Sequence, residues 1–165
     1  MGKWGALLLV LASSLASAKE RTVEISFVDW SSFHGDGLRI HVLERDVALE
    51  RCHGHAGGSL KVARRRAHLA DATAHALASA GAAVLDHPPD VVGRTGIPDE
   101  VSTRPAVTEA VRTRSLTVWS TDRGKQPAPL HTLRDALSTA IGETEQAPAT
   151  EVVVPGSDSG QWPPG

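Results

Sequence analysis

The spacing of apolar residues changes at about residue 70, and this change constrains the fold more than any other feature of the sequence. Before residue 70, apolar and polar residues alternate along "TVEISFVD", "LRIHVLE", "DVALERC" and "SLKVARRRA". An alternation of period two is typical of half-buried β-strands. Turn residues at Asp36-Gly37 and near Arg45-Asp46 separate the first three segments. We therefore expect four short strands joined by short turns.

After residue 70 the apolar spacing becomes that of two helices. One side of the first helix carries Leu69, Thr73, Leu77, Ala80 and Val84, and Gly81 stands where a C-terminal cap is expected. The second helix is predicted in "APLHTLRDALSTAIG", with Pro129 in its first turn and Gly142 at its end. One face of this second helix carries Leu130, Leu133, Leu137 and Ile141.

The segment between the helices contains a loop and two more predicted strands. Residues 82–104 carry three prolines and two glycines without a steady period, which indicates a connecting loop. Two strands are then expected, with Val107 and Val111 in "PAVTEAVR" and with Leu116 and Val118 in "SLTVWS". These elements predict an α+β domain: an antiparallel sheet of about five to six strands with two helices on one face.

The two ends of the chain are predicted to lie outside this domain. Residues 1–18 combine a basic start at Lys3, a short apolar run and a small-residue cleavage site at Ala16-Ser17-Ala18, as in a secretory signal peptide. An uncleaved membrane helix is the alternative, but the apolar run is well short of the roughly 20 residues that span a bilayer. Residues 19–142 then form the domain, and the polar, proline-rich residues 143–165 are expected to be a flexible tail. We expect an exported protein, periplasmic or extracellular, without membrane insertion after cleavage.

Charge and cysteine content restrict the partners and the source of stability. Without Lys3 the chain has 16 basic and 19 acidic side chains, which argues against nucleic acid or an anionic membrane as partner. The basic run Arg64-Arg65-Arg66 is a local exception that fits a solvated strand end. Because Cys52 is the only cysteine, no intrachain disulfide can form. The apolar core must therefore hold the fold.

Two groups of residues are candidate metal ligands. In "ERCHGHAGG", Cys52, His53 and His55 are of suitable types, but Cys52 and His53 would point to opposite faces of a strand. His53 and His55 could therefore supply two ligands of a metal site, or they are simply the polar end of a strand. The second group, His68, Asp71 and His75, would share one stripe of the first helix. That stripe lies opposite Leu69, Thr73 and Leu77, so a solvated helix face explains it equally well.

No pattern in the sequence predicts a catalytic site or a cofactor. "GSDSG" at residues 156–160 has Asp158 where a nucleophile elbow needs serine, and it lies in the expected tail. "GHAGG" lacks the lysine and the spacing of a phosphate-binding loop. We therefore expect no cofactor, and the absence of such patterns favours a noncatalytic role while leaving an enzymatic one open.

Several motifs taken in order resemble a family of small exported bacterial domains of unknown function. That family has a two-cysteine turn, a hairpin, a helix, two strands and a final helix. "SFHGDG" stands at the cysteine turn, "RDVALERCHGHAGG" looks like the hairpin strand, and "RRRAHLADATAHAL" looks like the strand-to-helix join. "STRPAVTEAV" and "PAPLHTLRDALSTAIG" resemble the later strand and the last helix, so the likeness covers about residues 22–142.

The departures from the family limit what the resemblance implies. Ser32 and Asp36 stand where the family has its cysteine pair, and Thr103 stands where it often has aspartate. Any role of that cysteine pair is therefore missing here. Since the family has no settled activity, the resemblance implies a fold and an exported location, and it transfers no catalytic residue.

These observations favour a noncatalytic exported module that binds another protein or an envelope component. The order of elements is also faintly similar to the emfourins, small bacterial inhibitors of thermolysin-like metalloproteases, although "SSFHGDG" lacks their double glycine. An emfourin-like inhibitor is therefore one alternative. A protein that binds metal through surface histidines is another.

Overall fold

The computed structural model describes residues 22–31, 36–54, 58–87 and 101–155. The elements in these residues are, in chain order, β1 (Glu24–Ser31), β2 (Asp36–Leu43), β3 (Asp46–Gly54), β4 (Ser59–His68), α1 (Asp71–Asp86), β5 (Ser102–Glu109), β6 (Arg112–Ser115), β7 (Val118–Trp119), a 3-10 helix η1 (Ser120–Lys125), α2 (Ala128–Glu145) and β8 (Thr150–Pro155). The four strands predicted before residue 70 are confirmed.

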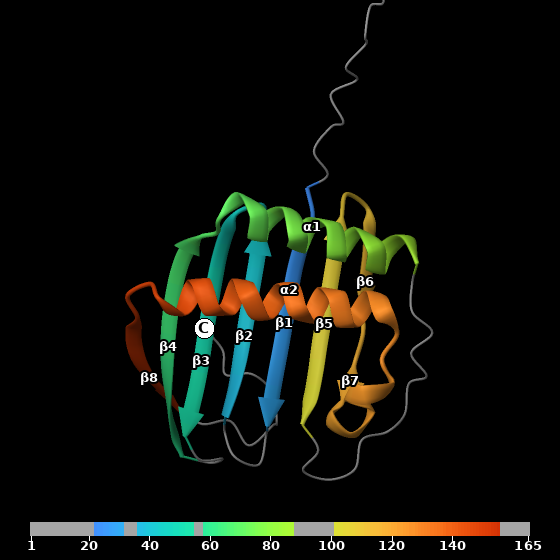
Figure 1. Cartoon of the computed structure of the whole chain (residues 1–165). Coiled ribbons are helices and arrows are strands. Elements are labelled where there is room, and N and C mark those ends of the chain that lie inside the picture. The colour runs from blue at the N-terminus through green and yellow to red at the C-terminus, as the bar shows by residue number, and fades with distance from the viewer. Residues whose placement is uncertain (1–21, 32–35, 55–57, 88–100, 156–165) are drawn as a thin grey trace, which may run out of the picture.

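The strands form one antiparallel sheet with both α-helices on the same face (Figure 1). The strand order is β6-β5-β1-β2-β3-β4-β8, and β7 pairs with the end of β5. After the β1–β4 meander, α1 crosses the sheet so that β5 can pair with the free side of β1. The predicted α+β class and helix placement are confirmed. Within the described residues the sheet has eight strands, so it is larger than the five to six expected.

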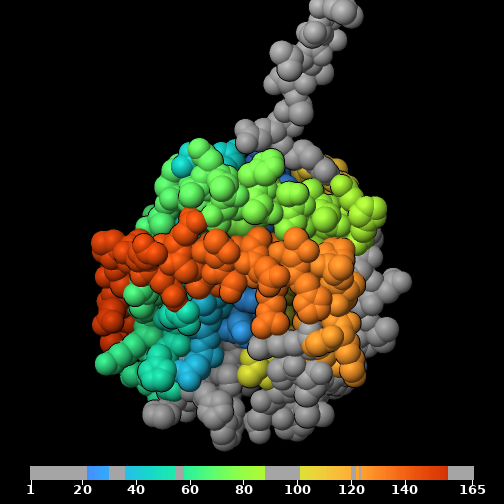
Figure 2. All heavy atoms as spheres, viewed as in Figure 1, coloured from blue at the N-terminus to red at the C-terminus, as the bar shows by residue number. Residues whose placement is uncertain are grey.

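The core lies between the helices and the face of the sheet that they cover. Alternate residues of the central strands point into it, as the period of two requires. The predicted helix stripes also point into it, and Figure 2 shows the two helices packed against each other on this face. The largest fully buried side chains of this core are Ile25, Ile40, Val42, Leu49, Leu69, Leu77, Val84, Val107, Leu133 and Leu137.

The two glycines predicted to end the helices instead lie inside them, so both predicted helix ends are wrong. α1 continues from Gly81 to Asp86, and α2 continues from Gly142 to Glu145. Gly81 is buried, and a Cβ there would lie 2.9 Å from Cγ1 of Val23. Gly81 therefore allows α1 to approach the sheet closely. A Cβ at Gly142 would meet nothing within 4 Å. The predicted position of Pro129, in the first turn of α2, is confirmed.

The region after α1 also departs from the prediction. Residues 82–86 complete α1 and residues 102–104 begin β5, so the loop predicted at 82–104 is too long at both ends. Residues 88–100 lie outside the described part of the chain. β5 ends at Glu109, and the chain turns through Ala110, which has a φ of 52°. Val111 therefore lies outside the strand in which it was predicted, and it is 99% exposed. Within "SLTVWS", Ser115 ends β6 and Val118–Trp119 form the two-residue β7, in which Val118 is buried.

Part of the predicted flexible tail belongs to the domain. Residues 143–145 complete α2, and Thr150–Pro155 pair with β4 as the edge strand β8. The reason is a second apolar cluster on the face of the sheet away from the helices, where Val152 and Val154 pack against Cys52, Leu60 and Val62. The prediction of a tail beginning at residue 143 is therefore wrong for residues 143–155. Residues 156–165 lie outside the described part of the chain.

The predicted signal peptide, residues 1–18, also falls outside the described ranges. Within those ranges, neither α-helix combines the length and the apolar character needed to cross a membrane.

Candidate functional site

An open groove of about 1270 Å³ runs along α1, between the helix and the ends of β1 and β2. Its apolar walls come from both elements. The sheet contributes Val23, Ile25 and Val42, and the helix contributes Ala72, Ala74, Leu77, Ala78, Ala82 and Ala83. A second hollow, between α2 and the sheet, is far smaller, at about 20 Å³.

The composition of α1 explains why the groove exists. The helix sequence DATAHALASAGAAVLD contains large apolar side chains almost only on the stripe that faces the core. Elsewhere its apolar residues are mainly alanines, whose short side chains leave a concave surface along the helix. Gly81 holds the helix close to Val23, while Ala78 and Ala82 leave space beside it. The helical spacing predicted the buried stripe of α1 but did not predict this groove.

Charged residues stand at both ends of the groove. At the start of α1, Arg45 Nη1 lies 2.5 Å from Asp71 Oδ1, and Glu44 lies beside this pair. At the other end, Arg112 Nη1 donates to Asp86 Oδ1 at 2.9 Å. Asp71 and Asp86 each have an arginine partner. Among the described residues, the partner of the third groove carboxylate, Glu44, is the hydroxyl of Thr22, which donates to it at 3.5 Å.

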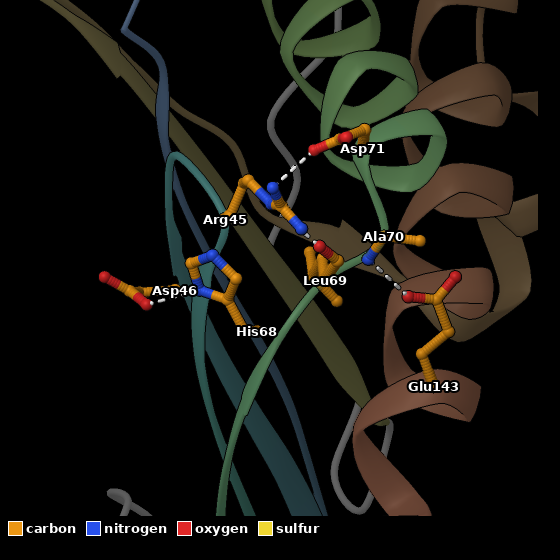
Figure 3. Close-up of polar contacts among 7 residues, drawn as sticks. All are labelled: Arg45, Asp46, His68, Leu69, Ala70, Asp71 and Glu143. Carbon is orange, nitrogen blue, oxygen red and sulfur yellow. Dashed lines mark hydrogen bonds and ion pairs between the residues drawn. The ribbon is translucent and has the colours of Figure 1, made fainter.

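Polar contacts fix the start of α1 beside the groove (Figure 3). Leu69 N–H donates to the carbonyl of Arg45 at 2.9 Å, and Arg45 Nε donates to the carbonyl of Leu69 at 3.0 Å. α1 has no side-chain cap of its own, but the carboxylate of Glu143 in α2 accepts from Ala70 N–H at 3.2 Å. Glu143 also accepts from the hydroxyl of Thr73. A carboxylate at this end is favourable because it meets unpaired N–H groups and the positive end of the helix dipole.

The structure separates the predicted group His68, Asp71 and His75. His68 is the last residue of β4 and does not lie on the helix, so the prediction of a single helical stripe is wrong for it. The chain is still pairing with β3 at this point, and His68 Nδ1 contacts Asp46 Oδ1 at 2.9 Å. Asp71 is held by Arg45, and His75 is exposed on the wall of the groove.

The structure also separates Cys52 from His53, the two described members of the other predicted group, Cys52, His53 and His55. Cys52 is buried on the face away from the helices, opposite Val62, whereas His53 is exposed on the other face and contacts Asp36. The expected separation of Cys52 from His53 is confirmed. His55 lies outside the described residues. Among the described residues, no three His, Cys, Asp or Glu side chains lie close enough to hold a metal ion.

The environment of Cys52 does not favour a nucleophile. Burial raises the pKa of the Cys52 thiol, and the nearby carboxylates of Asp36 and Glu50 raise it further. The neutral thiol is therefore the favoured form. A cysteine with these surroundings behaves as a small apolar core residue.

The second hollow, between α2 and the sheet, has a volume of only about 20 Å³. That volume is close to the space of a single water molecule. It therefore leaves no room for an organic ligand.

Comparison with protein-family models, with curated proteins and with solved structures finds no match to this chain. The resemblance to the family of small exported domains therefore stays a prediction.

Proposed function

We propose that this protein is a noncatalytic exported module that binds another protein or an envelope component, and that its partner lies in the groove beside α1. The observation that carries the proposal is the groove itself, an open apolar concavity of about 1270 Å³. It is larger than a typical small-molecule pocket of about 300–1,000 Å³.

The shape and chemistry of the groove favour a segment of polypeptide as the occupant. Alanines on the wall present little side-chain bulk, so the backbone of a partner segment can approach α1 closely. The partly exposed alanines Ala74, Ala78 and Ala83 offer apolar surface on which apolar side chains of a partner can be buried. Glu44 at the rim favours a partner that carries a basic side chain at that end. We propose an apolar segment flanked by a basic residue.

The polar residues of the groove do not support catalysis. A general acid or base needs a second group that orients it, and a nucleophile needs an adjacent base. Among the described groove residues, Asp71 and Asp86 are engaged with arginines. Among the contacts between described residues of the groove, none joins a histidine to a carboxylate. A binding role requires none of these arrangements.

The test is site-specific photo-crosslinking in the native cell. Ser79 lines the groove, whereas Ser138 is an exposed serine on α2 that does not line it. A photoreactive amino acid replaces one or the other serine. We expect a discrete crosslinked adduct at position 79 and none at position 138.

The partner recovered from that adduct then allows a direct affinity measurement. Ser79→Arg should weaken its binding by at least about tenfold, because a long charged side chain would occupy the groove, while Ser138→Arg should leave binding unchanged. The same adducts at both positions, or no adduct at position 79, would contradict the proposal.

A further inference from the structure

The edge strand β8 exposes apolar side chains and unpaired backbone groups on its outer side. Among the described strands, β8 is the last of the sheet order, and its one partner there is β4 (Figure 1). Val153, which points to the same side of the sheet as the helices, is 68% exposed. A row of unpaired N–H and C=O groups on an edge strand is a template for another strand.

The direction of the backbone groups follows from one hydrogen bond at the opposite side of the sheet. Leu116 N–H donates to the carbonyl of Pro105 at 3.0 Å, so the polar groups of Pro105 point away from β1. Hydrogen-bonded and non-bonded pairs alternate across antiparallel ladders. Five strand pairings without a bulge connect β5 to β8, so the side to which each residue's backbone groups point can be followed from strand to strand. It directs the N–H and C=O groups of Glu151 and Val153 outward, away from β4.

The position of Pro155 agrees with this assignment. Pro155 belongs to the same outward set, and proline, which has no N–H, is tolerated in an edge strand where its nitrogen points outward. The inner ladder to β4 therefore loses no donor at this residue.

The two edges of the sheet differ in how they resist pairing. β6 has only four residues, all exposed, and it carries Arg112 and Arg114. Short length and charge are the usual protections of an edge. β8 has six residues, three of them consecutive valines, and its one charged residue is Glu151. β8 is longer than β6 and has fewer charges, and Val153 is exposed on it, so it is less protected than β6.

We propose that β8 pairs with β8 of a second copy of this chain, antiparallel about a two-fold axis at Val152, so that two sheets join into one. In this register, Glu151 of each copy stands opposite Val153 of the other, and both residues have outward N–H and C=O groups. Four backbone hydrogen bonds result. Moving the axis to Val153 would place Pro155 opposite Glu151 and lose a donor in each pair. Two-fold pairing of identical surfaces also closes the assembly.

Charge complementarity supports a second copy as the occupant. Lys61 is opposite Val153 in the ladder between β4 and β8, and both point to the helix side of the sheet. In the dimer, Glu151 of the second copy is the next residue in this row, about 9–10 Å from Lys61 at the backbone, which is two strand spacings. The lysine side chain can reach that carboxylate across Val153 and cover it. Within the described part of the chain, neither Lys61 nor Glu151 has an ion-pair partner, and the two-fold axis creates the pair twice.

The test is sedimentation velocity of the purified full chain over a concentration series. We expect a monomer–dimer equilibrium. Because two attractive pairs become repulsive, Glu151→Lys should raise the dimer dissociation constant about tenfold. The double variant Glu151→Lys with Lys61→Glu should return it to within about threefold of the original, since the pairs are restored with reversed charge.

A matched pair of exposed valines separates edge pairing from general surface effects. Val153→Lys should abolish the dimer, whereas Val111→Lys, at the far end of the sheet, should leave it unchanged. Far-UV circular dichroism checks that every variant is folded. A wild type that is monomeric at all concentrations, or that binds a strand of another protein without forming dimers, overturns the proposal. So does a double variant as weak as Glu151→Lys. The crosslinking at Ser79 concerns a different surface, so either proposal can fail without the other.

Discussion

Gly81 and Gly142 lie at interior positions of helices in opposite surroundings, so replacing each by alanine should change stability in opposite directions. Alanine is favoured over glycine inside a helix by roughly 0.5–1 kcal/mol, chiefly because glycine loses more backbone freedom on folding. At Gly142 the new methyl group meets nothing within 4 Å. Gly142→Ala should therefore raise the free energy of unfolding by roughly 0.5–1 kcal/mol.

At Gly81 the same intrinsic gain is opposed by a steric conflict. The added Cβ would lie 2.9 Å from Cγ1 of Val23, 3.2 Å from Cγ1 of Val107 and 3.3 Å from Cδ1 of Ile25. Val23 and Val107 are β-branched and buried, so they cannot rotate away easily. Forcing an extra carbon into a packed core costs about 1–3 kcal/mol. Gly81→Ala should therefore lower the free energy of unfolding by about 1 kcal/mol, which separates the two variants by about 2 kcal/mol.

The assay is urea unfolding followed by circular dichroism, with the wild type and both variants compared at a common slope. Combining Gly81→Ala with Val23→Ala tests whether the contact with Val23 causes the loss of stability. In a Val23→Ala background the methyl group has space, so Gly81→Ala should become neutral or stabilising, with a coupling free energy of about 1–2 kcal/mol. If Gly81→Ala stabilises the protein as much as Gly142→Ala does, the close approach of α1 to the sheet is refuted.

Two further predictions concern the start of α1 and the buried thiol. Glu143→Ala should lower the free energy of unfolding by about 1 kcal/mol, as loss of a helix cap does, because Ala70 N–H and the Thr73 hydroxyl lose their acceptor. Asp135→Asn, an exposed change on α2, should leave the urea midpoint unchanged, and equal midpoints for the two variants would contradict the cap. The raised pKa of Cys52 means that the unfolded chain loses the thiol proton first as pH rises, so stability should be full below the ordinary value of 9.0 and fall above it. Urea midpoints from pH 7 to 10 should show this fall, Cys52→Ala should reduce it, and an identical fall in Cys52→Ala would contradict it.

The elements that could be predicted are those whose signal lies within one segment. The alternation of Ile25 with its neighbours, and of Ile40 and Leu49 with theirs, follows from strand geometry alone, because successive side chains point to opposite faces. The stripe from Leu69 to Val84 follows from the period of a helix in the same way. The separation of Cys52 from His53 needed nothing more than this alternation.

The errors have a common physical origin in contacts between distant segments. Glycine is a frequent helix terminator, and only the position of Val23 shows why Gly81 is needed within α1. The segment "TEVVVP" is short and lies in a polar, proline-rich region, so its composition indicated a tail. It is a strand because β4 offers it an open edge, next to Cys52 and Leu60.

The candidate site was missed for a related reason. A groove is a space that side chains do not fill, and the alanines of α1 leave it open only because β1 and β2 end beside them. Glu143, which caps α1, is 73 residues from Ala70 in the sequence. The sequence instead suggested metal sites where several histidines lie close together in the chain. The number of histidines in a segment does not show where their side chains point.

The sequence by itself determined the class of the fold, the inward face of each central strand and the buried stripe of each helix, because these depend on side-chain spacing along a single segment. Only the tertiary structure decided where the helices end, that β8 completes the sheet and that a groove lies beside α1. These features depend on which segments meet. That choice is made by the burial of apolar surface and the pairing of backbone groups over the whole chain.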